Sequence, residues 1–150
     1  MDITSDNSKF ASAGVDKNIV VWDVATSSIL RRFNAHTGTV FDVKFAGAPV
    51  NTDGETTAGG NDGSLLVTGG FDATLRMYDL RAQGAWRPIL ESKEGNDAIQ
   101  CLQVRGSTVW TGSVDGVVRM YDVRMGSVTQ DTIDGQCRER AWYKCTFAGY

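Results

Sequence analysis

"VDGVVRMYDVR" at residues 114–124 and "FDATLRMYDLR" at residues 71–81 are near copies of one another, 43 residues apart. Both copies place an aspartate second, the letters RMYD at the same offset, and an arginine last. A more divergent third copy, "VDKNIVVWDVA", occupies residues 15–25. Agreement at fixed offsets indicates that the chain is built from repeated structural units.

Each copy contains the pattern of a β-hairpin. Asp115-Gly116 separates two β-prone runs, residues 108–112 and 117–121, and this dipeptide favours a hairpin because the tight turn needs residues that tolerate positive φ. The same interpretation applies around Asp72, between residues 65–69 and 74–78, and around Asp16, between residues 10–13 and 19–22. An aspartate in such a turn accepts hydrogen bonds from backbone N–H groups, which favours a structural role.

Further strands complete each unit as a four-stranded antiparallel meander. Residues 28–33, 87–92 and 128–133 follow the hairpins, and residues 40–45 and 99–104 precede the next ones. The run "IVVWD" at residues 19–23 is apolar at consecutive positions, so both faces of this strand must be covered. Stacked sheets would cover them, and we predict an all-β fold.

Composition excludes several classes of protein. A formal charge of −3 argues against a nucleic-acid binder that works by bulk charge neutralisation, so we expect no direct nucleic-acid binding. We also expect no membrane association and a cytoplasmic or nuclear location, because apolar runs are short and the first 30 residues lack a secretion signal pattern. The three cysteines lack CxxC spacing and indicate neither a disulfide framework nor a zinc site. We expect no cofactor.

A family resemblance follows from the repeat. Units of about 40 to 45 residues with four strands, and an aromatic-Asp pair closing the third strand, resemble the WD-repeat β-propeller family. Ala35-His36 stands where that family usually has Gly-His, and the resemblance covers residues 9–134. The aromatic-Asp pairs are Trp22-Asp23, Tyr78-Asp79 and Tyr121-Asp122.

The resemblance implies a division of the chain into blades. We expect a partial first blade at residues 1–34, a second blade at 35–93, a third blade at 94–134, and a divergent tail or the start of a further blade at 135–150. The second blade carries an inserted loop at residues 46–64, which we expect to be a disordered surface loop, and which lacks the Lys-Ser/Thr of a phosphate-binding loop.

We therefore expect the chain to be a fragment of a propeller. Three units are fewer than the 4 to 8 blades usual in this architecture, and the first unit is expected to begin at its second strand. Uncovered blade faces would be exposed, so self-association or partial unfolding is expected.

His36, the only histidine, is expected to belong to a structural network and not to a catalytic site. In a meander, the loop entering the first strand and the turn between the second and third strands lie at the same end, so His36 and Asp72 can meet, and the Thr68 hydroxyl can join them. The family is known for an Asp, His, Ser/Thr and Trp network. Carried over, it implies His36, Thr68, Asp72 and Tyr78 in the second blade, although a phenol does not present its donor where an indole N–H would be.

The other two blades carry incomplete sets. The first has Ser12, Asp16 and Trp22, and its histidine would lie before Met1. The third has Thr111 and Asp115, with Gly95 at the histidine position and Cys101 where Asp42 stands in the second blade.

Family resemblance also suggests a function. Propellers of this family serve chiefly as protein-binding platforms, which favours a non-enzymatic scaffold. The stretches "TGSVDGVVRMYDVRMGSV", "WDVATSSILRRFNAHTGTVFDVKF" and "LESKEGNDAIQCLQV" are most similar to the mitogen-activated protein kinase organizer group. That resemblance implies kinase-cascade and pre-mRNA splicing components as partners.

A second binding class stays open. "YDLR" and "YDVR" resemble the aromatic-Asp-x-Arg box by which some propellers dock as substrate receptors on cullin-4 ubiquitin ligases, with Arg81 and Arg124 as contact residues. The structural interpretation is that these arginines pack over a neighbouring strand and pair with a local carboxylate. An enzyme is the least supported class, because neither paired carboxylates nor a metal-ligand cluster nor an activated nucleophile can be named.

Overall fold

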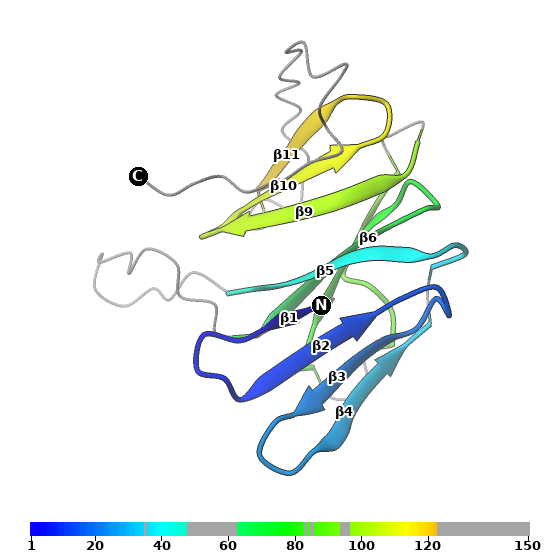
Figure 1. Cartoon of the computed structure of the whole chain (residues 1–150). Coiled ribbons are helices and arrows are strands. Elements are labelled where there is room, and N and C mark those ends of the chain that lie inside the picture. Colours follow the sequence, from blue (N-terminus) through cyan, green and yellow to red (C-terminus); the bar gives the residue numbers. More distant parts are fainter. Residues whose placement is uncertain (35, 48–62, 83, 85, 94–96, 123–150) are drawn as a thin grey trace.

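The computed structural model describes residues 1–34, 36–47, 63–82, 84, 86–93 and 97–122. These residues form β-strands and turns without a helix, as the sequence predicts. The strands make three antiparallel sheets, which we call blades 1 to 3 (Figure 1). Blade 1 contains β1 (Asp2–Ile3), β2 (Lys9–Ala13), β3 (Ile19–Asp23) and β4 (Ser28–Phe33); blade 2 contains β5 (Val40–Ala46), β6 (Leu65–Gly70), β7 (Leu75–Asp79) and β8 (Leu90–Ser92); blade 3 contains β9 (Ile99–Arg105), β10 (Thr108–Ser113) and β11 (Val118–Asp122).

Two expectations about strands are corrected. Blade 1 does not begin at its second strand, because Asp2 and Ile3 pair with Ala11 and Phe10 of β2 and so form a short first strand. The fourth strand of blade 2 covers only Leu90–Ser92 and not residues 87–92, because Pro88 has no N–H to donate to the sheet. The strand predicted at residues 128–133 and the tail at 135–150 lie outside the described residues.

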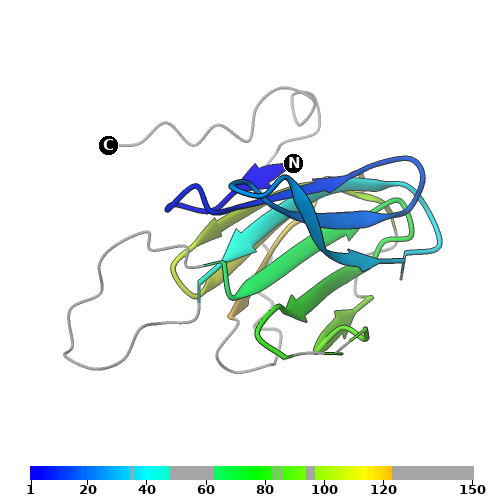
Figure 2. The same cartoon turned by 90° about the horizontal axis from the view of Figure 1, so that it is seen from below.

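The blades stack face to face, and each of the two interfaces contains a hydrophobic core. Between blades 1 and 2 the core includes Ile19, Val21 and Phe33 from the first and Phe45, Leu66 and Tyr78 from the second. Between blades 2 and 3 it includes Val67, Leu75 and Met77 on one side and Ile99, Leu102 and Val109 on the other. Figures 1 and 2 show β5 next to β9, and β1 and β2 next to β5, which places the first strand of each blade beside that of the next.

The hairpin turns have the conformation that the Asp-Gly pattern predicts. In each turn the residue after the aspartate has positive φ, at 65° for Lys17, 59° for Ala73 and 79° for Gly116. The N–H of each of these residues donates to the carbonyl three residues earlier, which is Gly14, Gly70 or Ser113. Only one of the three turns has glycine at this position, so the turn is maintained by its hydrogen bonds as well as by residue type.

Candidate functional site

His36 lies buried at the end of blade 2 where β6 turns into β7. Its Nδ1 is 3.0 Å and 3.1 Å from the two carboxylate oxygens of Asp72, and its Nε2 is 2.8 Å from the Thr68 hydroxyl. Because an ionised carboxylate can only accept, Nδ1 carries the proton and donates to Asp72, and Nε2 accepts from Thr68. The meeting of His36, Thr68 and Asp72 inferred from the meander geometry is therefore present.

Asp72 is the centre of this network. Its carboxylate also accepts from the backbone N–H of Thr37 at 3.0 Å, from the Thr74 hydroxyl at 2.6 Å and from Arg76 Nη1 at 3.0 Å. Burial raises the pKa of Asp72, but the hydrogen bonds from the Thr74 hydroxyl, the His36 ring and the Thr37 N–H outweigh it and hold the pKa well below its ordinary value. The carboxylate is therefore ionised across the physiological range.

Arg76 extends the network to the outer strand of the blade. Its Nη2 donates to Glu91 Oε1 at 3.0 Å, so the guanidinium lies between two carboxylates. Burial lowers the pKa of Arg76, but the hydrogen bond to Glu91 and the charge of Asp72 outweigh it and leave the pKa above its ordinary value. The guanidinium is thus paired on both sides although the arginine is only 6% exposed.

The site holds the hydroxyl of Thr68, the imidazole of His36 and the carboxylate of Asp72 in the order found in Ser/His/Asp catalytic sites. It is nevertheless closed to substrate. Thr68 is 0% exposed and His36 is 3% exposed. Burial lowers the pKa of His36 below 6.5, with Asp72 opposing and Arg76 reinforcing the shift, so the ring is neutral near pH 7. Both ring nitrogens already have partners, and the arrangement functions as a set of satisfied buried hydrogen bonds.

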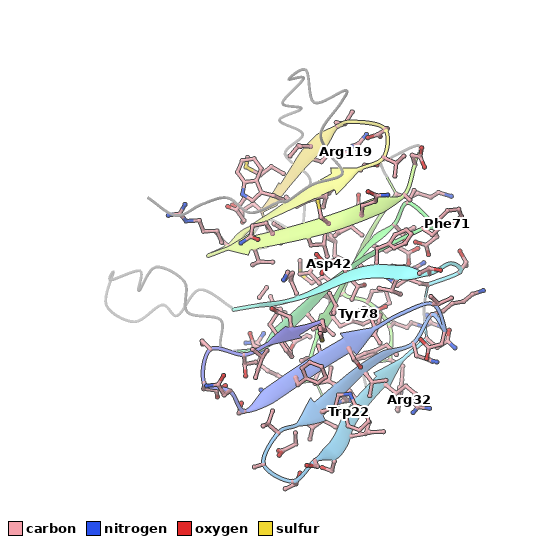
Figure 3. The ribbon with its side chains drawn as sticks, viewed as in Figure 1. Trp22, Arg32, Asp42, Phe71, Tyr78 and Arg119 are labelled. Carbon is pink, nitrogen blue, oxygen red and sulfur yellow. The ribbon has the colours of Figure 1, made fainter. Side chains whose placement is uncertain are left out.

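Tyr78 does not take part in the network that the resemblance implies. Its hydroxyl is buried and has no hydrogen-bond partner among the described residues. The ring packs instead against Phe33, with ring centroids 4.4 Å apart, and burial raises the pKa of Tyr78 to about 12. In blade 1 the equivalent Trp22 does donate, from Nε1 to Ser12 Oγ at 3.2 Å. Figure 3 labels both rings, with Tyr78 between blades 1 and 2. The phenol oxygen lies in a different place from an indole nitrogen, which explains the difference.

Blades 1 and 3 keep only parts of the network. In blade 1, Asp16 accepts from the backbone and side-chain amides of Asn18. In blade 3, Asp115 pairs with Arg119 at 2.8 Å, while the Thr111 hydroxyl is buried without a partner among the described residues. Residue 95, the predicted histidine position, lies outside those residues.

Two aspartates that the sequence analysis gave no role connect neighbouring blades. Asp2 Oδ2 accepts from the backbone N–H of Phe45 at 2.8 Å, across the interface of blades 1 and 2. Asp42 Oδ2 accepts from Leu102 N–H at 2.9 Å, and Figure 3 shows Asp42 between blades 2 and 3. The only sign of this role in the sequence was a carboxylate in an otherwise apolar inner strand. The residue of the next blade that donates to it can be identified only when the fold is known.

Exposed apolar side chains gather at the end of the blades that carries His36. Phe41 and Phe71 are 45% and 65% exposed, and their rings meet edge to face with centroids 6.3 Å apart. Val15 and Val114, which are 79% and 41% exposed, occupy the position of Phe71 in the other two turns, directly before the turn aspartate. We call these four residues the rim residues. The repeated pair of an apolar residue followed by aspartate is the sequence signal that could have identified them.

Arg81 has the local partner that the structural interpretation predicts. Its Nε and Nη2 donate to the two carboxylate oxygens of Asp79, at 3.1 Å and 2.9 Å, while the side chain stays 62% exposed. Arg124 lies outside the described residues. Within the described ranges, the His, Cys, Asp and Glu side chains form no group able to hold a metal ion, and no helix there is long and apolar enough to cross a membrane.

Comparison with known proteins agrees with this architecture. The family model described as "WD domain, G-beta repeat" matches residues 1–23 and 27–79, just over half of the chain. The chain belongs to the WD-repeat family. A WD relative, the WD repeat domain-containing protein 83 homolog of Dictyostelium discoideum, is 30% identical over 107 residues. The match covers 71% of this chain but 28% of that protein, so the chain spans well under half of the relative's length.

Proposed function

We propose that this WD-repeat chain is a non-enzymatic scaffold that binds other proteins through its rim residues. Membership of the family implies a protein-interaction role. The observation that carries the assignment of a surface is the exposed Phe41–Phe71 pair, because large aromatic side chains contribute strongly to protein interfaces. A pair that already packs together loses little conformational freedom on binding.

The rim is anchored to the buried network, which supports its use as a rigid platform. The backbone N–H of Phe71 donates to Thr39 at 2.8 Å, and that of Thr37 donates to the Asp72 carboxylate. Gly38 lets the chain approach Phe71, since a Cβ there would lie 3.1 Å from Phe71 Cβ. Loops fixed in this way present side chains in one arrangement.

Kinase-cascade and pre-mRNA splicing components are the partners that we propose, with action in the cytoplasm or nucleus. This finer assignment rests on the resemblance to the kinase organizer group described above. The alternative, a substrate receptor for a cullin-4 ubiquitin ligase, would use Arg81 and Arg124. The Arg81 guanidinium is held in place by Asp79 and remains 62% exposed at the other end of the blade.

Separate substitutions test the two surfaces. Phe41→Ser/Phe71→Ser removes the aromatic pair, Arg81→Ala removes the exposed guanidinium, and Ile89→Ser changes an exposed apolar residue outside both surfaces. We expect the parent chain to retain kinase-cascade or splicing proteins from a cell extract, identified by mass spectrometry, and only the double phenylalanine variant to lose them. Retention of a ligase adaptor that only Arg81→Ala abolishes would support the alternative.

A further inference from the structure

An uncovered apolar row crosses all four strands of blade 1. Ile3, Phe10, Trp22 and Ile29 are successive cross-strand partners, and directly opposed residues share one face of a sheet. Ile3 and Ile29 are each 46% exposed, and Phe10 and Trp22 are half-buried. The opposite face of the same sheet carries Ile19 and Val21, which are buried against blade 2.

The matching rows of the other two blades are covered by the preceding blade. In blade 2, the row is Phe45, Leu66 and Tyr78, all at most 1% exposed in the core shared with blade 1. In blade 3, Val109 and Tyr121 are 0% and 3% exposed in the core shared with blade 2. The row is therefore the surface of a blade that receives its predecessor.

The surface that covers such a row comes from the opposite face of the preceding blade. Blade 2 covers blade 3 with a set of apolar residues from β6 and β7, and blade 3 carries a corresponding set on its own far face. The blade 2 set is Leu65, Val67, Leu75 and Met77, and the blade 3 set at the same register positions is Thr108, Trp110, Val118 and Met120, all half-buried. In the described part of the chain, one receiving row and one covering set thus remain without a blade against them.

We propose that two copies of this chain associate head to tail, with the blade 3 covering set of each copy seated on the blade 1 row of the other. These two surfaces are the halves of an interface that the chain already forms twice within itself. A second copy is the occupant that fits, because it carries both a covering set and a receiving row, the two halves of that interface. Closure by two copies also leaves no covering set free for further growth.

The mass of the 150-residue chain in solution tests the association directly. Size-exclusion chromatography with light scattering is expected to give twice the chain mass of 16.3 kDa, falling toward the single mass on dilution. A mass of one chain at every concentration would overturn the proposal, and so would a series of ever larger species. This measurement does not depend on any variant.

Two variants test the direction of association. Ile29→Glu places a charge on the receiving row, and Trp110→Glu places one on the covering set. Each alone is expected to give a single-chain mass, because both interfaces of the pair contain the altered residue. An equimolar mixture is expected to recover dimers, since the Trp110 surface of one variant and the Ile29 surface of the other are both intact. Phe71→Ser, on the rim, is the matched control and should stay dimeric.

Circular dichroism of each variant separates loss of folding from loss of association. Where one of the two glutamate variants lacks the β-sheet spectrum of the parent, Ile3→Glu or Val118→Glu replaces it on the same surface. Dimers that survive both folded variants, or folded variants that never recover dimers when mixed, would contradict head-to-tail pairing.

Discussion

Trp22 and Tyr78 occupy the same position in successive blades, yet only the Trp22 ring donates a hydrogen bond, to Ser12. We therefore expect Tyr78→Phe to leave the free energy of unfolding unchanged or to raise it, because it removes a buried hydroxyl without a partner among the described residues. Trp22→Phe should lower it by about 1 kcal/mol through the lost hydrogen bond. Denaturant unfolding compares the two, and a larger loss for Tyr78→Phe than for Trp22→Phe would show that the phenol has a partner after all.

His36→Ala is expected to lower the free energy of unfolding by about 1 to 3 kcal/mol, because Thr68 and Asp72 then lose a buried partner. Asn34→Ala, an exposed change in the same connection, is the control and should have little effect. Unfolding in urea measures both. A His36→Ala protein as stable as the parent would mean that the network does not stabilise the fold.

Stability should fall on acidification in two stages. The pKa of folded His36 lies below 6.5, so the unfolded state binds more protons as the pH drops; the stabilisation is complete above pH 6.5 and is lost toward the folded pKa. Asp72 has a lowered pKa, so its contribution is complete above pH 3.8 and is lost below that value. Thermal unfolding of the parent and of His36→Gln at several pH values measures this. The variant should lack the first stage, and a parent that gains stability between pH 7 and 5.5 would show the opposite shift of the His36 pKa.

Gly69→Ala should destabilise the contact between blades 2 and 3. A Cβ at residue 69 would lie 2.6 Å from Ile99 Cγ2 and 3.2 Å from Ile99 Cβ, and a branched side chain next to its own backbone has little freedom to move away. Overpacking of this kind costs about 1 to 3 kcal/mol. Gly14→Ala is the matched control, because its Cβ would meet only Asp16 Oδ1 at an ordinary 3.6 Å. Equal melting temperatures for the two variants would disprove the close approach of β6 and β9.

The sequence was sufficient for most of the architecture because its repeats are local. Each hairpin around Asp16, Asp72 and Asp115 is encoded by a few neighbouring residues, and strand order follows from the meander. The meeting of His36 with Asp72 also followed, since both lie at one end of the same blade. That the Tyr78 hydroxyl would not replace an indole N–H followed from the chemistry of the side chain, but the packing of its ring against Phe33 could not be predicted, because the two residues lie in different blades.

Contacts between blades were also beyond the sequence. The hydrogen bonds from Asp2 to Phe45 and from Asp42 to Leu102 join residues 43 and 60 positions apart, and nothing local at either end specifies the partner. The rim pair is similar, because Phe41 lies in β5 whereas Phe71 lies in the turn after β6, and the two rings meet only through the pairing of β5 with β6. Exposure of an aromatic ring is likewise a property of the assembled surface.

The central claim is that the rim binds partners whereas the His36 network only holds the fold. Phe41→Ser/Phe71→Ser and His36→Ala, compared in one experiment for melting temperature and for retention of kinase-cascade or splicing proteins, test it most directly. We predict that the double phenylalanine variant melts like the parent and loses the partners, and that His36→Ala melts lower but retains them at temperatures where it is folded. A double phenylalanine variant that melts like the parent and still retains every partner would contradict the account.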